Sequence, residues 1–378
     1  MATGWVGVGA RRVRRVERRE PLPRAPAVQG HAGTQRDRHL AHHRPLRRRH
    51  QRLHHQGVHG LLLPAPGGAI ATIGIELLGD VLTSPSLRTS DVDTERQVIL
   101  EEIAWTTTVP TTSSSGCSAS RCSSITLGRD TAGSPVDDLD DERRRRALLP
   151  SVTTPPIDGG VDRRAVRTRR DARRGEHRVR RGASRRRSGG GCPVATGTST
   201  SVDDDTEQVH LVVGGLGVDR HDPDREALDV VNHVLGGGLS SRLFDELRER
   251  RGLVYSVYSG LACYADTGTW SISTSSQPHH ADEVAALIGA ELARLVEGGV
   301  TDDELAIATG YLTGSYELGL EDSGSRMMRN GGLLCTRGEI APIGDQVARW
   351  EAVDRATVER VIDRVLRTEP IVVRLGPG

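Results

Sequence analysis

The residues with the clearest chemical potential in this sequence form two pairs, each seven positions apart. Glu95 and Glu102 lie in the stretch 91–104, whose apolar residues recur with helical periodicity, so both carboxylates face the same side of the expected helix. Carboxylates placed in this way either coordinate a cation or remain solvated. Arg248 and Tyr255 supply a cation and a phenol, two groups that can form hydrogen bonds with a polar ligand. The plain alternative is a surface arginine and a half-buried strand tyrosine.

Two other groups of potential metal ligands are weaker candidates. His39-Leu40-Ala41-His42-His43 lies in an Arg/His-rich block of low complexity, which favours adventitious metal binding over a dedicated site. The five cysteines are scattered without C-x-x-C pairing, so they predict reduced thiols in a cytoplasmic protein rather than a disulfide framework. They are Cys117, Cys122, Cys192, Cys263 and Cys335.

The charge of the chain is balanced overall but unevenly distributed. Lys and Arg number 51 against 50 Asp and Glu, so the whole-chain charge predicts no particular partner. Basic residues crowd 11–52 and 143–187, and the second block resembles a nucleic-acid-binding tail. That block has no interleaved aromatic residues for base stacking and no recognised nucleic-acid motif, which argues against a specific nucleic-acid partner.

Nothing in the sequence predicts secretion or a membrane. The chain does not open with a positively charged segment followed by an apolar one, and it contains no apolar run of about 18 residues. We therefore expect a cytoplasmic location.

The second half of the sequence predicts a globular domain that mixes helices and hairpins. Strand patterns occur at 209–218, 254–263, 268–276 and 371–375, and helical patterns at 223–235, 240–250, 282–297 and 358–365. Thr301 and Glu304 form a capping box that opens a further helix. This mixture favours the α+β class.

The first half, by contrast, is a patchwork. The stretches 70–81 and 91–104 have clean helical periodicity. Around them lie Arg/His-rich, Thr/Ser-rich and Arg/Gly-rich blocks without periodicity. Polar blocks of low complexity cannot bury enough apolar surface to fold alone, so we expect this half to be incomplete or disordered.

The glycine-rich segment before Arg248 carries a family resemblance. Residues 236–248 read G-G-G-L-S-S-R-L-F-D-E-L-R, and 252–259 read G-L-V-Y-S-V-Y-S. This resembles the second-domain signature of the pitrilysin/insulinase-type zinc metallopeptidases, which include mitochondrial processing peptidase. Shorter pieces resemble the first domain in the family's order: a strand at 4–10, helices at 74–80 and 95–103, and a loop at 127–135.

The resemblance implies a fold and an activity. The fold is two similar α+β domains, each an antiparallel sheet backed by helices, and the activity is zinc-dependent hydrolysis of peptides. By resemblance Glu102 matches the third zinc ligand and Glu95 a supporting acid. Arg248 and Tyr255 match a pair that holds the substrate backbone and steadies the oxyanion near the metal.

The zinc motif that the resemblance requires is missing. The family mechanism needs H-x-x-E-H on a helix, which supplies two zinc ligands and the general base. The segment expected to hold it, 19–32, reads R-E-P-L-P-R-A-P-A-V-Q-G-H-A, and its three prolines forbid a regular helix. No catalytic set is intact, so we expect the chain to be inactive as written and to bind no zinc specifically.

A change of reading frame accounts for the loss. Synonymous codons for 19–33, read one nucleotide later, can spell A-S-H-F-L-E-H-L-L-F-K-G-T-P, and the same offset over 47–67 gives a further family-like segment. A different offset does so over 105–113. We therefore hypothesise that the patchwork blocks are out-of-frame translation, arising from sequencing errors or a decayed gene.

We expect a degraded N-terminal peptidase domain over 1–195 and an inactive-type peptidase domain over 205–378. The partner implied is a peptide or an unfolded polypeptide, with a homodimer or a catalytic sibling subunit as further options. The alternative function is a non-catalytic partner subunit, which keeps the peptide cavity and loses the zinc motif. Such a subunit should preserve the helix around the motif, whereas here the helix itself is destroyed.

Overall fold

The computed structural model describes residues 2–7, 51–55, 58–63, 98, 100–101, 199–265 and 267–377. The chain divides into two compact units. One comprises 1–105, 130–189 and 319–341, and the other comprises 106–129, 190–318 and 342–378. Each unit therefore draws on segments from distant parts of the sequence.

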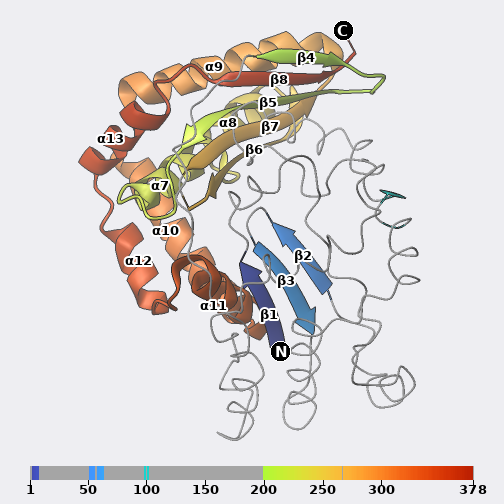
Figure 1. Cartoon of the computed structure of the whole chain (residues 1–378). Helices are drawn as coiled ribbons and strands as arrows, with labels where there is room; N and C mark the ends of the chain where they lie inside the picture. Colours follow the sequence, from blue (N-terminus) through green and yellow to red (C-terminus); the bar gives the residue numbers. More distant parts are fainter. Residues whose placement is uncertain are drawn as a thin grey trace, which may run out of the picture. The chain divides into compact units, whose positions relative to one another are not determined.

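The described part of the first unit is a small antiparallel sheet with one helix. Strands β1 (Ala2–Gly7), β2 (Gln51–His55) and β3 (Val58–Leu63) pair in the order β1-β3-β2. Helix α11 (Ser323–Arg337) lies against β1 (Figure 1). The strand predicted at 4–10 is confirmed as far as Gly7, and the remainder of that stretch lies outside the described residues.

The hairpin β2–β3 corrects the sequence analysis, which placed 51–63 among the blocks without regular structure. The reason is tertiary pairing. Strand β3 is central, so its backbone is paired on one side by β1 and on the other by β2. Of the helices predicted at 70–81 and 91–104, only Val98, Leu100 and Glu101 are described, and all three are helical.

The second unit is built on a five-stranded sheet in the order β4-β8-β5-β7-β6. Its strands are β4 (Thr200–Asp203), β5 (Val209–Gly217), β6 (Val254–Cys263), β7 (Gly268–Ser276) and β8 (Ile371–Gly376). Strand β4 runs parallel to β8, and the other neighbouring pairs are antiparallel. The four predicted strands are confirmed, and β4 is an addition that the sequence patterns did not reveal.

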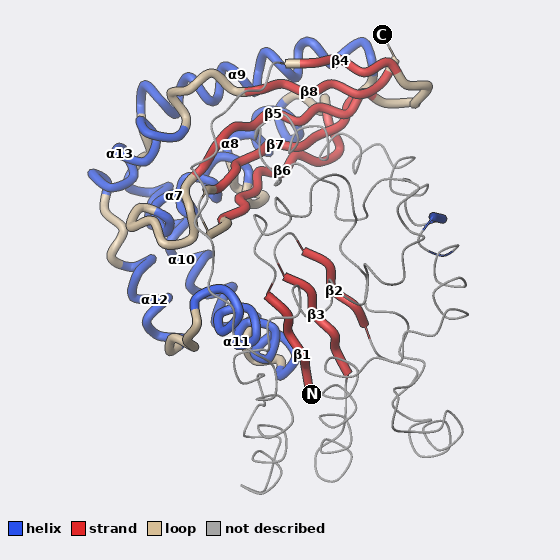
Figure 2. Tube along the Cα trace, in the orientation of Figure 1, coloured by secondary structure: helices blue, strands red, loops and turns tan. Residues whose placement is uncertain are grey.

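The helices of the second unit cover one face of this sheet (Figures 1 and 2). They are α7 (Arg225–Gly236), α8 (Arg242–Phe244), the π-helix η4 (Asp245–Arg250), the 3-10 helix η5 (Pro278–His280), α9 (Ala281–Gly298), α10 (Asp302–Gly319), α12 (Ile343–Glu351) and α13 (Arg355–Val365). The predicted helices are confirmed with one change. The stretch 240–250 is a short α-helix that continues as a π-helix.

Alternation along the strands produces the core. On β7, Trp270 and Ile272 are buried under the helices, while Ser271 and Ser273 between them are half-exposed on the other face. The α+β class is therefore confirmed: a mixed, mostly antiparallel sheet is backed by aliphatic helix faces. The residues that α9 and α13 bring to this core are Val284, Ile288, Leu292, Leu295, Val358, Val361, Ile362 and Val365.

The start of α10 is a capping box, as the sequence predicts. The Thr301 hydroxyl accepts a hydrogen bond from the Glu304 amide at 3.2 Å, and the Thr301 amide donates to the Glu304 carboxylate at 2.8 Å. Within the described parts of the chain, no helix is long and apolar enough to cross a membrane.

Candidate functional site

Arg248 and Tyr255, which sequence reasoning singled out, lie side by side. Arg248 lies on η4 and Tyr255 is the second residue of β6. The guanidinium carbon of Arg248 is 5.7 Å from the centre of the tyrosine ring. This distance is within the range of a cation–π contact. Tyr255 is 84% exposed, so the pair lies at the surface.

The turn between η4 and β6 creates this proximity. Leu243 and Leu247 anchor the helical segment because both are fully buried in the core. Gly252 then reverses the chain with a φ of +62°, a left-handed conformation that favours glycine. The Leu253 amide donates to the Leu247 carbonyl at 2.9 Å, which closes the turn, and β6 begins at Val254, one residue before Tyr255.

A second ring completes the surroundings of Arg248. The guanidinium carbon lies 5.0 Å from the centre of the Phe244 ring, and Phe244 is the single phenylalanine of the chain. Arg248 also donates to the Glu249 carboxylate at 2.8 Å, an exposed pair that contributes little stability. Sequence reasoning missed Phe244 because its type suggests only core packing, although its place four residues before Arg248 is a helical neighbour's position.

Exposed apolar side chains belong to the same segments. Tyr258 on β6 is 67% exposed, and Leu239, in the glycine-rich loop before α8, is 77% exposed. Tyr258 pairs with Ser273 of β7 on the sheet face away from the helices. The site therefore offers a cation, phenol hydroxyls and apolar surface, which suits a polypeptide better than a small ion.

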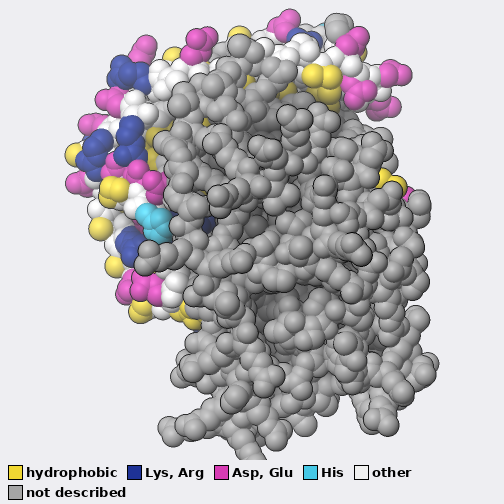
Figure 3. All heavy atoms as spheres, in the orientation of Figure 1, with side chains coloured by type: hydrophobic (Ala, Val, Ile, Leu, Met, Phe, Trp, Pro, Cys, Tyr) yellow, Lys and Arg dark blue, Asp and Glu magenta, His cyan; other side chains and the backbone are white. Residues whose placement is uncertain are grey.

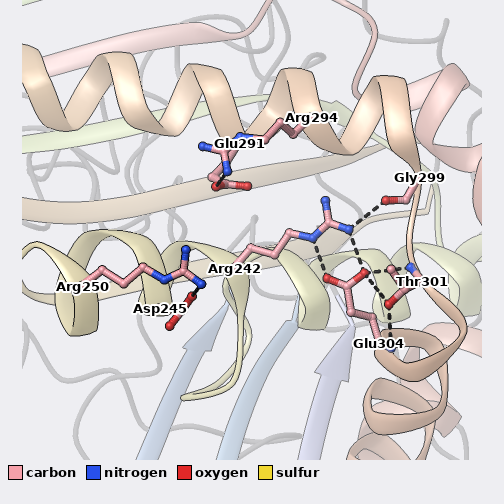
Figure 4. A network of polar contacts seen from close by, with 8 residues as sticks. All are labelled: Arg242, Asp245, Arg250, Glu291, Arg294, Gly299, Thr301 and Glu304. Carbon is pink, nitrogen blue, oxygen red and sulfur yellow. Dashed lines mark hydrogen bonds and ion pairs between the residues drawn. The ribbon is translucent and has the colours of Figure 1, made fainter.

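Arg242, at the first position of α8, is held by a carboxylate from another helix (Figure 4). Its Nε and Nη2 donate to the two carboxylate oxygens of Glu304 at 2.6 and 2.7 Å, and Nη2 also donates to the Gly299 carbonyl at 2.8 Å. The hydrogen bond from Arg242 holds the pKa of Glu304 below its usual value, and the same bond raises the pKa of Arg242. The sequence could not reveal this pair, because 62 positions separate its members.

Two further ion pairs surround the segment (Figure 4). Arg250 contacts Asp245 at 2.7 Å, within η4 itself. Arg294 contacts Glu291 at 2.7 Å on α9, where burial raises the pKa of the Glu291 carboxyl. These pairs are local to their helices, whereas Arg242 and Glu304 join separate elements.

The residues that the resemblance matches to metal ligands are not among those that the structure describes. Glu95, Glu102 and the histidines at 39–43 lie outside the described residues. Within the described ranges, no three His, Cys, Asp or Glu side chains could hold a metal ion. The H-x-x-E-H motif is absent from the whole sequence, and Glu102, which matches a zinc ligand by resemblance alone, could not hold zinc as a single carboxylate. The residues present therefore do not fit the metal.

Known proteins resemble this chain in both sequence and fold. The model of the peptidase M16 inactive domain matches residues 177–309. A protein of Streptomyces coelicolor named as an uncharacterized zinc protease is 35% identical over 320 residues, which cover 81% of this chain and 69% of the relative. A Mycobacterium tuberculosis protein of the same description is 32% identical over 318 residues, covering 82% and 73%.

The chain belongs to the peptidase M16 family. More distantly, the alpha subunit of mitochondrial processing peptidase from Caenorhabditis elegans is 26% identical over 181 residues, covering 44% of this chain and 34% of the subunit. A crystal structure described as a peptidase M16 inactive domain from Pseudomonas fluorescens superposes with a TM-score of 0.82 at 18% identity, covering all of this chain and 92% of the other. The family and the α+β peptidase fold inferred from residues 236–259 are thus confirmed.

The M16 match identifies the described domain as the family's inactive type. Its glycine-rich segment, η4 and the start of β6 all fall within the matched residues 177–309. The surface over the helices carries acidic and basic side chains intermingled rather than a field of one sign (Figure 3). This mixture offers no reason to prefer a nucleic acid over a polypeptide.

Proposed function

We propose that this chain is a non-hydrolysing member of the M16 metallopeptidases which binds extended peptides through Arg248 and Tyr255. One observation carries the proposal: an exposed phenol with a guanidinium 5.7 Å from its ring, on the inactive-type domain of a peptidase family. Peptide binding needs only these contacts, whereas hydrolysis needs the missing zinc motif.

The two side chains provide complementary hydrogen bonding. Arg248 carries five N–H donors, of which one meets Glu249, so the others can donate to peptide carbonyl oxygens. The Tyr255 hydroxyl can donate to a carbonyl or accept from an amide. In an intact relative the same donors would be aimed at the charge that develops on the scissile carbonyl.

We further propose that the zinc motif was lost by a change of reading frame. The alignment with the Streptomyces protein covers 81% of the chain, and because the part from residue 199 onwards is less than half, the alignment extends into the first half. This coverage supports descent of the first half from a family domain, and the change of frame is argued from the back-translated segments at 19–33, 47–67 and 105–113. Sequencing the gene around codons 10–70 tests the idea. An insertion or deletion relative to close relatives is expected, and an uninterrupted frame without one would overturn it.

We propose that the protein acts in the cytoplasm and that its ligand is a peptide or an unfolded polypeptide. Its partner would be a second copy of the chain or a catalytic sibling subunit. The scattered cysteines support a reducing compartment. The non-catalytic subunit remains the competing account of the missing motif, and an uninterrupted gene would favour it.

Peptide binding by the full chain tests the proposal. A library of fluorescent unfolded peptides should bind with micromolar affinity, as monitored by anisotropy, and Arg248→Ala or Tyr255→Ala should weaken binding by about tenfold, since each removes a hydrogen bond or ring contact. Arg355→Ala is the matched control, because it removes an arginine on α13 whose side chain is 49% exposed, against 39% for Arg248. Added zinc should produce no cleavage. Unchanged affinity in both variants, or zinc-dependent cleavage by the chain as written, would contradict the proposal.

A further inference from the structure

Arg248 reaches its aromatic neighbours through an unusual helical segment. Three α-helical residues, Arg242 to Phe244, pass into the six-residue π-helix η4. A π-helix bonds residue i to i+5 instead of i+4, so each turn holds an additional residue, and such turns are often found at functional sites. An extra residue rotates every following side chain by about 100° relative to an α-helix. The direction of Arg248 therefore depends on how the segment begins.

Helix α8 begins without the side-chain N-cap hydrogen bond that usually fixes the start of a helix. Ser241 precedes α8 with the extended backbone of an N-cap residue, yet its hydroxyl makes no capping hydrogen bond. The hydroxyl oxygen is buried and has no hydrogen-bond partner among the residues that the structure describes. Since a buried unpaired hydroxyl is unfavourable, the position of this residue must be imposed by neighbouring contacts.

The Arg242–Glu304 clamp supplies these contacts. It comprises the two charge-assisted bonds to the Glu304 carboxylate and the bond to the Gly299 carbonyl, and both charged side chains are about three-quarters buried, with 20% and 27% exposed. Bidentate pairing fixes the plane of the guanidinium as well as its position. Thr301 fixes Glu304 in turn through the capping box.

We propose that Arg242 and Glu304 are positioning residues: their clamp sets the start of the π-helical segment and thereby aims Arg248 at Phe244 and Tyr255. The consequence for binding rests on the proposed function of Arg248 and Tyr255. The geometric claim itself does not, because it concerns the position of one guanidinium relative to one phenylalanine ring.

The single phenylalanine makes this position measurable. Full-length chain grown with 4-fluorophenylalanine carries fluorine at Phe244 alone. Its ¹⁹F resonance senses the charge of the guanidinium that lies 5.0 Å from the ring centre. Arg248→Ala defines the resonance without that charge. Glu304→Gln breaks the ion pair but keeps the shape and an oxygen that can accept from Thr301, and Arg242→Lys keeps the charge but loses the bidentate fork.

Glu304→Gln and Arg242→Lys are both expected to move the Phe244 resonance towards its position in Arg248→Ala. Neither should move it further once Arg248 is already Ala. Asp354→Ala is the matched control, because it removes the side-chain cap of α13, where Asp354 accepts from the Thr357 amide at 2.8 Å, and leaves the Arg242 pair in place. It should lower the melting temperature without moving the resonance.

Peptide-binding measurements distinguish the claim about the position of Arg248 from the claim that Arg248 binds peptides. Glu304→Gln should weaken binding by about fivefold, a smaller loss than Arg248→Ala because Arg248 is displaced rather than removed. If Arg248→Ala leaves affinity unchanged, the proposed function fails, yet the fluorine spectra still decide the geometric claim. If Glu304→Gln and Arg242→Lys lower the melting temperature but leave the Phe244 resonance at its parent position, the clamp is merely structural and the inference is overturned.

Discussion

Replacing Gly268 by alanine should destabilise the C-terminal sheet by about 3 kcal/mol or more, because the added Cβ meets rigid backbone on two sides. That atom would stand 2.0 Å from the Val218 carbonyl oxygen and 3.0 Å from the Ala262 carbonyl oxygen. Gly268 pairs with Gly217 on β5 and with Cys263 on β6, so neither neighbouring strand can retreat without breaking the ladder. The end of a flexible side chain could move away from the added Cβ, whereas these backbone carbonyls are held in the sheet and cannot.

At Gly289 the same change, glycine to alanine, is expected to raise stability instead of lowering it. Gly289 lies in the middle of α9, and a Cβ there would meet nothing within 4 Å. Since alanine is favoured over glycine inside a helix, Gly289→Ala should stabilise the domain by about 1 kcal/mol. Denaturant midpoints followed through tryptophan fluorescence measure both variants, because Trp270 and Trp350 are buried in this unit. Equal and small shifts of the same sign would contradict the packing described here.

Asp224→Asn is expected to cost about 2 kcal/mol at pH 7, since it removes a buried carboxylate that two arginines share. Asp224 is 3% exposed just before α7. It accepts from Arg360 at 2.6 Å and from Arg364 at 3.1 Å, both on α13. The arginines are about half exposed and regain water when the carboxylate is lost, which keeps the cost below that of a fully buried pair.

The pH dependence of this cost has a defined sign. The hydrogen bond from Arg360 lowers the pKa of Asp224 below its ordinary value of 3.8. The carboxylate therefore contributes stability above that value, and the contribution is lost as the pH falls through the lowered pKa. Unfolding free energies of parent and variant should differ most near neutrality and converge in acid. Asp363 on α13 forms an exposed pair with Arg367, so Asp363→Asn should change stability by no more than about 0.5 kcal/mol. A gap for Asp224→Asn that persists unchanged in strong acid would refute the assignment.

The sequence predicted the second unit well because its elements carry local signals. Alternation gave the bounds 254–263 and 268–276 without error, and the Thr301–Glu304 spacing gave a real capping box. The π-helix escaped prediction because buried leucines at 243 and 247 keep an ordinary helical spacing while the backbone changes. Strand β4 escaped because four mostly exposed residues have no hydrophobic pattern to read.

The candidate site was predicted in part. Arg248 and Tyr255 were found through the family motif, and the contact between them is now described. Phe244 and the Arg242–Glu304 clamp were not foreseen, because contacts between separate elements leave no trace in the spacing of residues. Roles for Glu95 and Glu102 stay predictions, as both residues lie outside the described part of the chain.

Helix α11 has a consequence for how the chain is made. It packs on β1, although more than 300 residues separate Gly7 from Ser323. A contact between residues so far apart in the sequence forms late in folding, because closing the long loop between them costs conformational entropy before the contact contributes any stability. During synthesis β1 emerges before this helix and must wait without it while more than 300 further residues are added. Premature termination anywhere before residue 323 would therefore leave the nascent N-terminal sheet without that cover, a natural target for chaperones.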